Sequence, residues 1–435
     1  MNYLEGEETR RPKPRGVLGK GTPGVLLLAV LVLLLALVTR FPLLTRLFYV
    51  LVLMLAGGYL WAWLNLQWLE VKVDRRTPRI HVGQQLVERI TVRNRGWLPK
   101  SWLEVVDLSD IQEHHPGRTI SLARNSFRSW RTNTPAKRRG AYNLGPLRIA
   151  TSDPFGLFNL ERYDCDTQQV LVLPKVVPLS RFLAPPADLV GDDFMRQRSH
   201  QVTTHAATVR DYLPGDGVGR VHWPSSARLG KLMVKEFDAG LTSKAWVMVD
   251  LEGAIQVQHE EDATDELAVT AAASIARHLL KARQPVGVAV NAKELLLLPP
   301  DWSLIQDARI LDMLALAKAE GGTPLEEAVI KLDPWLKRHS SLVVITASTS
   351  NRWVGGMRML GYRGVRLAVI LVDGTTFGGE NSTKALLPAL SALGVHAYVV
   401  GRGDDLAKAL SHPITGRQNA FVLASNDPVL LLKGA

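Results

Sequence analysis

Two long apolar stretches dominate the hydrophobic pattern near the start of the chain. Residues 21–39 contain no charged side chain, and residues 47–69 form a second uncharged stretch that includes only Asn65 and Gln67 as strongly polar positions. At about 1.5 Å of rise per residue, a helix of either length crosses a hydrocarbon core of about 30 Å. The pattern therefore predicts a transmembrane helical hairpin. A signal peptide is the competing interpretation of the first stretch, and a buried hairpin in a soluble core competes for both.

The Lys and Arg residues around these stretches predict the orientation. Nine flank the hairpin, in the basic tail of residues 1–20 and just after residue 69, whereas the link carries only Arg40 and Arg46. Because cytoplasmic segments are enriched in Lys and Arg, both ends are expected in the cytoplasm and the later domains on the cytoplasmic face of a bilayer. Aromatic residues that suit the headgroup layer crowd the end of the second stretch: Tyr59, Trp61, Trp63 and Trp68.

Residues 70–178 have the texture of a β domain. The positions of Leu86, Glu88, Ile90 and Val92 alternate with those of Val87, Arg89, Thr91 and Arg93, which is the period of a strand. Further short apolar segments follow at intervals of about ten residues, separated by Gly and Pro. They are residues 101–108, 118–123, 127–132, 141–149 and 168–173. We expect an antiparallel β-sandwich of Ig-like type.

Residues 241–435 change to alternating β and α patterns. Buried strands are expected at residues 245–251, 286–291, 342–346, 365–372 and 395–400. Helices are expected between them, at residues 262–283, 303–319 and 323–337 and around Met357 and Leu386. Thr323 is expected to cap the third of these helices, with Pro324 in its first turn and Glu326 completing a capping box.

This alternation predicts a doubly wound sheet that is mostly parallel and carries helices on both faces. Ligands of such folds lie beyond the carboxyl ends of the strands. The loops after Asp250, Thr346 and Asp373 are therefore where a ligand site is expected.

Composition narrows the class of protein. The 435 residues carry a formal charge of +11 and one cysteine, Cys165, which excludes an internal disulfide framework and a multi-cysteine metal site. No phosphate-binding GxxxxGK[ST] sequence occurs, and Ser225, Ser226 and His222 lack the GxSxG context of a nucleophile. The Arg-rich residues 124–139 lack a nucleic-acid motif and are expected to be a solvated sheet face first and a lipid-facing one second.

Three segments carry a resemblance to a known family. They are Asn94–Pro99 followed by Trp102, Arg138–Leu147 leading to Ser152–Phe158, and Arg210–Asp216 followed by Arg220, Trp223, Arg228 and Val234–Phe237. In this order, after two hydrophobic spans, they resemble the bacterial family called "domain of unknown function 58". The resemblance implies a protein of the inner membrane with a von Willebrand factor A-like cytoplasmic domain. It also implies association with MoxR-type AAA+ ATPases.

A von Willebrand A-like domain implies a possible Mg²⁺ site, built from Asp-x-Ser-x-Ser, a distal Thr and a distal Asp. Asp250 and Thr323 match two of these five ligands, and Glu252 stands where the first Ser is expected. Ala254 and Ala347 replace the other Ser and the distal Asp. Because hard Mg²⁺ requires oxygen ligands, we expect no bound metal and no other cofactor.

The third segment, within the connecting residues 179–240, is the candidate interaction motif, and two interpretations of it stay open. Its residues are Arg210, Asp211, Tyr212, Asp216, Arg220, Trp223 and Arg228. In the structural interpretation, the carboxylates, Glu236 among them, pair with the arginines while Tyr212 and Trp223 pack beneath them. In the functional interpretation, the same charged and aromatic surface docks a partner.

The sequence thus predicts a membrane-anchored, non-enzymatic interaction scaffold that does not bind nucleic acid and works with a MoxR-type AAA+ ATPase. The alternative is a Mg²⁺-dependent adhesion-type module that uses Asp250, Glu252 and Thr323.

Overall fold

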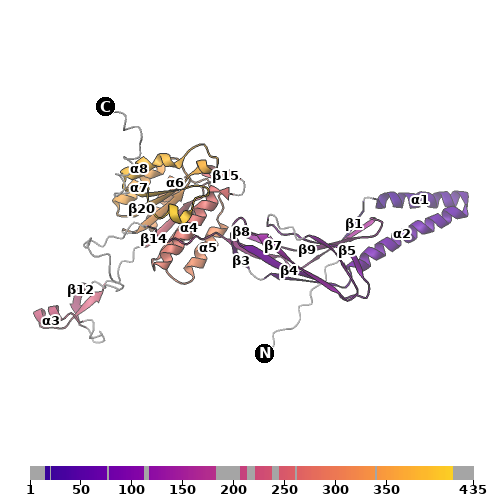
Figure 1. The fold of residues 1–435 in the computed structure, drawn as a ribbon, viewed down its shortest axis with the longest axis horizontal. Helices are drawn as coiled ribbons and strands as arrows, with labels where there is room; N and C mark the ends of the chain where they lie inside the picture. The colour runs from indigo at the N-terminus through magenta and orange to yellow at the C-terminus, as the bar shows by residue number, and fades with distance from the viewer. Residues whose placement is uncertain are drawn as a thin grey trace. The chain divides into compact units, whose positions relative to one another are not determined.

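The computed structural model describes residues 15–19, 21–75, 78–111, 117–182, 206–212, 221–237, 244–259, 262–338 and 340–414. By its internal contacts the chain forms two compact units, Met1–Leu173 and Pro174–Ala435 (Figure 1).

A pair of apolar helices opens the first unit. Helix α1 (Thr22–Thr39) is followed by its C-cap residue, Arg40, which adopts a left-handed φ of 53°. Helix α2 (Pro42–Leu66) begins two residues later, with Pro42 in its first turn. The second helix thus starts earlier than residue 47 and ends before residue 69, because Pro42 is tolerated in a first turn and Leu69 already belongs to a strand. Only 22% of the most hydropathic stretch of α1 and 11% of that of α2 is buried.

The rest of the first unit is a β domain of three sheets. One sheet has the order β1-β10-β9-β5-β6, a second β2-β4-β7 and a third β3-β11-β8. The strands are β1 (Arg15–Leu18), β2 (Leu69–Arg75), β3 (Arg79–His81), β4 (Gln85–Asn94), β5 (Lys100–Asp107), β6 (Arg118–Leu122), β7 (Phe127–Pro135), β8 (Gly140–Leu144), β9 (Leu147–Ser152), β10 (Phe158–Asp164) and β11 (Gln168–Leu173).

The expected alternation positions the core of this domain. Leu86, Ile90 and Val92 of β4 are buried, and Ile90 and Val92 join a hydrophobic cluster with residues of β5, β6, β9 and β10. The β-rich prediction for this region is therefore confirmed. One expected strand, residues 141–149, is instead two strands that belong to different sheets, because Gly145 turns the chain with a φ of +85°.

A strand that the sequence did not indicate ties the chain before α1 into this domain. Arg15–Leu18 forms β1, which pairs antiparallel with β10 in the register Arg15 with Glu161 and Leu18 with Phe158. The segment expected to be a basic tail thus contributes an edge strand to the sheet.

The second unit contains a six-stranded sheet of order β18-β17-β14-β19-β20-β21. All neighbouring strands are parallel except β17 and β18, which are antiparallel. The strands are β14 (Ala245–Asp250), β17 (Val286–Asn291), β18 (Leu295–Asp301), β19 (Ser341–Thr346), β20 (Arg366–Val372) and β21 (His396–Val400). The prediction of a mostly parallel α/β domain is confirmed.

Helices flank this sheet, as the 3.6-residue periodicity indicated. They are α4 (Thr264–Lys281), α5 (Gln306–Leu316), α6 (Leu325–Leu332), α7 (Arg352–Tyr362), α8 (Leu387–Ala392) and α9 (Leu406–Ala409). Helices α6, α7 and α8 share one hydrophobic core with Trp246 and Met248 of β14. Helix α4 packs on the same strand with its own buried row of small and aliphatic side chains.

The expected start of α6 is wrong. The helix begins at Leu325, its N-cap is Pro324 in extended backbone (φ −61°, ψ 149°), and no side chain caps it. Thr323 is therefore not the capping residue. The helix also ends at Leu332, because Pro334 follows in a short 3₁₀ turn (Asp333–Trp335).

Candidate functional site

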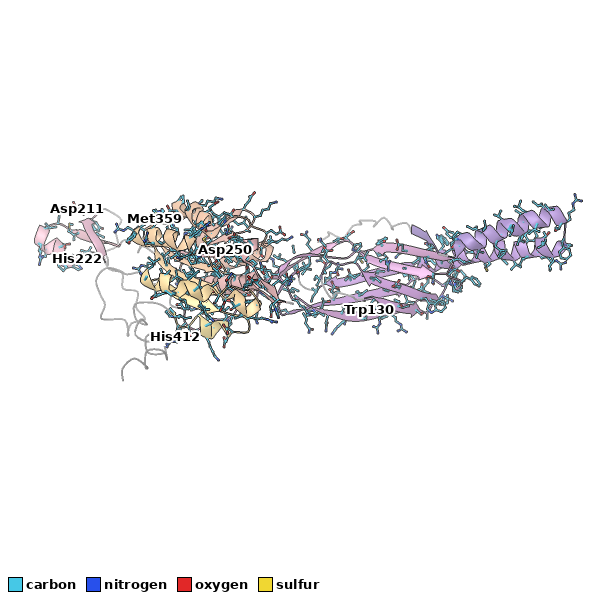
Figure 2. The ribbon with its side chains drawn as sticks, turned by 90° about the horizontal axis from the view of Figure 1, so that it is seen from above. Trp130, Asp211, His222, Asp250, Met359 and His412 are labelled. Carbon is cyan, nitrogen blue, oxygen red and sulfur yellow. The ribbon has the colours of Figure 1, made fainter. Side chains whose placement is uncertain are left out.

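The candidate interaction motif folds into a small module of its own. Strands β12 (Ala206–Asp211) and β13 (Met233–Phe237) pair antiparallel, with Asp211 opposite Met233, and helix α3 (Trp223–Leu229) lies between them in the chain. Asp211 and His222 belong to this module, whereas Asp250 ends a strand of the parallel sheet (Figure 2).

Hydrogen bonds at the start of α3 fix the helix against β13. His222 is the N-cap, and its Nδ1 accepts from the Ser225 backbone N–H at 3.3 Å and lies 2.7 Å from Ser225 Oγ. Ser226 Oγ donates to the His222 carbonyl oxygen at 3.0 Å and accepts from the Met233 N–H at 2.9 Å. These contacts give both serines and the histidine a structural role in capping and docking the helix.

In the structure, Asp211 forms an ion pair, whereas Trp223 is exposed. The carboxylate of Asp211 pairs with Lys231 Nζ at 2.9 Å, an exposed contact. The side chain of Trp223 is 62% exposed and does not pack beneath the charges, so the structural interpretation of this residue is wrong. Tyr212 is half-buried and its backbone N–H donates to the Leu232 carbonyl oxygen at 3.0 Å.

For the other motif residues the structure gives fewer contacts. Arg228 lies exposed in the last turn of α3, and Arg210 pairs with Val234 between β12 and β13. Asp216 and Arg220 lie outside the described residues. Among the motif residues whose side chains are described, Trp223 and Arg228 are therefore both exposed on one short helix.

The carboxyl ends of the parallel strands form the second candidate site, around the buried Asp250. Its Oδ1 accepts from Asn291 Nδ2 at 2.9 Å and from the Glu252 N–H at 3.3 Å, and its Oδ2 accepts from Thr346 Oγ1 at 2.7 Å. Burial raises the pKa of this carboxyl, while the hydrogen bonds from Thr346 and Asn291 act in the opposite direction. Residues at the ends of β17 and β19 thus donate hydrogen bonds to the carboxylate that ends β14, the strand between them.

This donor set does not fit Mg²⁺. Both oxygens of Asp250 accept hydrogen bonds from side chains, and the amide of Asn291 that approaches it also donates to the Thr323 carbonyl oxygen at 2.9 Å. Burial, followed by the charges of Asp250 and Glu326, raises the pKa of Glu252. Within the described residues, no group of three or more His, Cys, Asp or Glu side chains could hold a metal ion.

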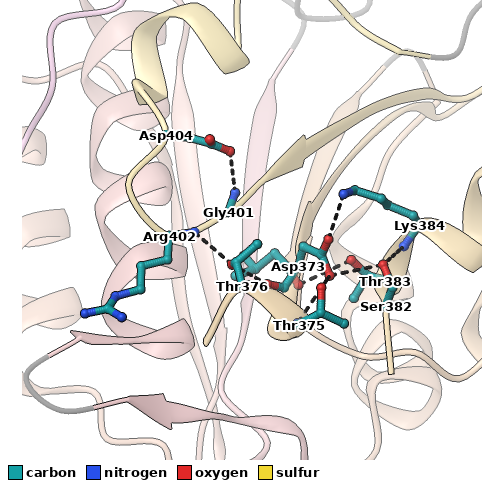
Figure 3. Close-up of polar contacts among 10 residues, drawn as sticks. Asp373, Thr375, Thr376, Ser382, Thr383, Lys384, Gly401, Arg402 and Asp404 are labelled. Atoms are coloured by element: carbon teal, nitrogen blue, oxygen red, sulfur yellow. Dashed lines mark hydrogen bonds and ion pairs between the residues drawn. The ribbon is translucent and has the colours of Figure 1, made fainter. Parts of the chain in front are cut away.

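Asp373, at the end of β20, is held in the same way (Figure 3). Its carboxylate accepts from Thr375 Oγ1 at 2.9 Å and Ser382 Oγ at 3.1 Å and pairs with Lys384 Nζ at 3.0 Å. Burial acts to raise the pKa of Asp373, but the contacts with Lys384, Thr375 and Ser382 hold it below its ordinary value. The carboxylate therefore remains ionised as the centre of a loop network.

The sequence predicts a ligand site in the loops after Asp250, Thr346 and Asp373, but it does not identify Asn291 and Lys384 as partners of Asp250 and Asp373. Asn291 ends β17, and Lys384 follows in a 3₁₀ turn. The order of parallel strands was the signal that could have found Asn291, because neighbours of β14 end at the same edge of the sheet.

One family match includes residues of both candidate sites. Residues 208–376, which include α3 and the strand ends at Asp250 and Thr346, match the family described as "Protein of unknown function DUF58". Over this segment the chain is similar to that family. The uncharacterized protein YeaD of Bacillus subtilis (strain 168) is 25% identical to it over 279 residues, which is 62% of this chain and 67% of YeaD.

Solved structures resemble this chain only weakly. The CARDB domain of PF1109 from Pyrococcus furiosus has a TM-score of 0.18 at 14% identity, and the alignment covers 24% of this chain and 94% of that domain. Proximal thread matrix protein 1 from the mussel byssus has a TM-score of 0.29 at 13% identity, with 39% of this chain and 46% of that protein covered. Both scores are too low to support an argument about fold or function.

Proposed function

We propose that this protein, which is similar to the DUF58 family over residues 208–376, is a membrane-anchored, non-enzymatic interaction protein that docks partner proteins on the cytoplasmic face through α3. The observation that carries the proposal is the 62% exposure of Trp223 within the segment that matches the family. Trp and Arg are the residue types that most often supply binding energy at protein interfaces, and Arg228 lies on the same short helix.

The exposed hairpin supports the membrane anchor. Leu27, Leu37 and Val38 of α1 and Leu43 and Leu53 of α2 are each more than 60% exposed. Exposing an apolar surface of this extent to water is unfavourable, so the surface is expected to contact lipid or another protein. A helix from the core of a soluble protein would instead be mostly buried. A removable signal sequence fits poorly, because β1, which precedes α1, is an integral strand of the domain that follows α2.

The same strand supports the orientation. Since β1 and β10 lie in one sheet, the chain before α1 and the chain after α2 share one side of the membrane. The excess of Lys and Arg outside the link supports a cytoplasmic location for this side. The second unit then faces the cytoplasm as well.

Two finer fold assignments belong to the proposal. The antiparallel sheets packed around Ile90 and Val105 support an Ig-like sandwich for the β domain. The order β18-β17-β14-β19-β20-β21, with an antiparallel β18 and Asp250 ending the central β14, supports a von Willebrand A-like second domain.

The carboxylates at the sheet edge support a non-enzymatic role without Mg²⁺. Asp250 and Asp373 are the buried acids at this edge, and each is engaged by side-chain donors from neighbouring elements. Such pairing fixes loop geometry. The Mg²⁺-dependent alternative requires Asp250 to exchange these donors for a cation.

A MoxR-type AAA+ ATPase is the partner that the family resemblance implies. A photocrosslinking amino acid at position 223 of the full-length chain, expressed in cells, tests both the site and this partner. The matched control is position 302, where Trp302 is 67% exposed. We expect protein adducts at position 223 that include an AAA+ ATPase. No adduct at 223, or the same adducts at 302, would remove α3 as the docking site.

A further inference from the structure

A turn of the β domain, Asp153–Leu157, contacts both helices of the hairpin. The N–H of Gly19 donates to the Leu157 carbonyl oxygen at 2.8 Å, and Thr22 Oγ1 donates to the same oxygen at the start of α1. On α2, a side chain at Gly58 would place its Cβ 3.2 Å from Asp153 Oδ2, so the absence of one lets the helix approach the turn closely. The turn is therefore fixed at the base of the hairpin.

Helix lengths define where this turn lies relative to a bilayer. From Thr22 to its end, α1 has 18 residues, which at about 1.5 Å per residue is about 27 Å. From Gly58 back to Pro42, α2 spans about 25 Å on the same basis. The free part of the hairpin thus has nearly the thickness of the hydrocarbon core, about 30 Å. The turn must then lie at the boundary between acyl chains and headgroups.

Most polar backbone groups of this turn form hydrogen bonds within the turn itself, as a segment with little access to water requires. The carboxylate of Asp153 accepts from the N–H groups of Phe155 at 2.9 Å and Phe158 at 2.6 Å. The Gly156 N–H donates to the Asp153 carbonyl oxygen at 3.1 Å, and the Asp153 N–H donates to that of Phe158 at 3.2 Å. Polar backbone groups must be satisfied internally where water is scarce, and this turn satisfies most of its own.

The turn directs a large apolar side chain outward. Phe155 is 63% exposed, although its neighbours Asp153 and Leu157 are buried. The ring of Phe158 packs edge-on against Tyr59 of α2, with centroids 5.6 Å apart, and Tyr59 is one of the aromatic residues suited to the headgroup layer. The turn that carries the exposed Phe155 is therefore followed directly by an aromatic contact with α2.

We propose that the Asp153–Leu157 turn enters the bilayer interface and that Phe155 contacts acyl chains, so that the β domain rests on the membrane. Trp97 and Trp102, 65% and 63% exposed, belong to the same domain and lie in the chain close to residues that contact the end of α2. Lys100 and Ser101, beside them, contact Leu64 and Asn65 of that helix. This inference rests on the proposed membrane anchor, because without a bilayer the turn has no lipid to meet.

Lipid-depth quenching of single labels tests it. Cys165 is first changed to Ser in the full-length chain, and one cysteine is then introduced as Phe155→Cys, Pro154→Cys, Val87→Cys or Leu53→Cys. Each variant carries an environment-sensitive NBD label in vesicles of phosphatidylcholine and phosphatidylglycerol that contain a lipid with a spin label high on its acyl chain. Val87, 40% exposed on β4, is the control in the same domain, and Leu53, 75% exposed on α2, reports the anchor.

We expect the spin-labelled lipid to quench the labels at positions 155 and 154 several-fold more than the label at 87, with a blue-shifted emission. Equal quenching at 155, 154 and 87 together with strong quenching at 53 would overturn this inference and leave the anchor intact. No quenching at 53 would overturn the anchor and this inference with it. The second position, Pro154, keeps the test valid if Phe155→Cys does not fold.

Discussion

Asn65 of α2 and Ser101 of β5 exchange hydrogen bonds in both directions. Asn65 Nδ2 donates to the Ser101 carbonyl oxygen at 2.6 Å, and the Ser101 N–H donates to Asn65 Oδ1 at 3.1 Å. The same amide donates to Thr151 Oγ1 at 2.7 Å. The end of α2 is thereby joined to two strands of the β domain, so we expect the two parts to fold as one body.

Asn65→Ala should therefore destabilise the first unit. The change leaves part-buried backbone groups of Ser101 without their partner, which costs about 1–3 kcal/mol. Thermal unfolding in detergent measures this loss. Asn159→Ala is the control, because Asn159 makes an exposed contact with Ser152 and should change the melting temperature little. Equal melting temperatures for Asn65→Ala and the parent chain would contradict a shared body.

The buried ion pairs of Arg75 predict a larger effect. Arg75 Nε pairs with Glu88 at 2.7 Å and Nη2 with Asp107 at 3.1 Å, and the side chains of both acids are fully buried. Arg75→Met removes the cation from two buried carboxylates and should cost about 3–5 kcal/mol. Arg95→Met is the matched control, since Arg95 is 62% exposed against Glu70 and its loss should cost about 0–1 kcal/mol. Chemical denaturation in detergent compares the two variants, and similar losses would be evidence against the buried network.

Lys100 predicts a rise in stability with pH. This side chain is buried, donates to the Leu64 carbonyl oxygen and lies 5.2 Å from the centre of the Trp68 ring. Burial lowers the pKa of Lys100 from 10.5 to about 8. Between these pH values the unfolded chain binds more protons than the folded chain, so the free energy of unfolding should increase as pH rises from about 8 toward 10.5.

The pH dependence is measured by denaturation across this range in the parent chain and in Lys100→Met. The variant should lack the rise. A parallel rise in both proteins would assign the effect to other groups.

The hydrogen bonds on Asp250 predict that stability is independent of Mg²⁺. Thr346→Val removes the donor to Asp250 Oδ2 and should cost about 1–3 kcal/mol. Melting of the parent chain and of the variant should be the same in Mg²⁺ and in chelator, and calorimetry should detect no Mg²⁺ binding. A parent chain that is stabilised by Mg²⁺ would support the adhesion-type alternative.

Local periodicity was enough to predict much of the fold. Alternation around Ile90 predicted β4, and the apolar runs ending at Asp250 and Thr346 predicted parallel strands. Strand β1 could not be predicted in this way, because four residues before α1 become a strand only through pairing with β10, far along the chain. The start of α6 was mispredicted because Pro324 adopts extended backbone, so the helix begins after it.

The candidate sites were predictable only in part. The motif around Trp223 was visible as a charged and aromatic segment, but its exposure depends on how α3 packs on β13. The partners of Asp250 come from β17 and β19, and only the order of the strands brings Asn291 and Thr346 to it. Tertiary neighbours of this kind leave no signal in local spacing.

Cysteine accessibility across the membrane tests the central claim most directly. In a Cys165→Ser background, Phe41→Cys reports the link between the helices, and Trp302→Cys reports the second unit; both positions are exposed. A membrane-impermeant maleimide is applied to intact spheroplasts and to lysed ones. The account predicts that Phe41→Cys is labelled in intact spheroplasts and Trp302→Cys only after lysis. Labelling of Trp302→Cys in intact spheroplasts, or recovery of the chain in buffer without detergent, would contradict it.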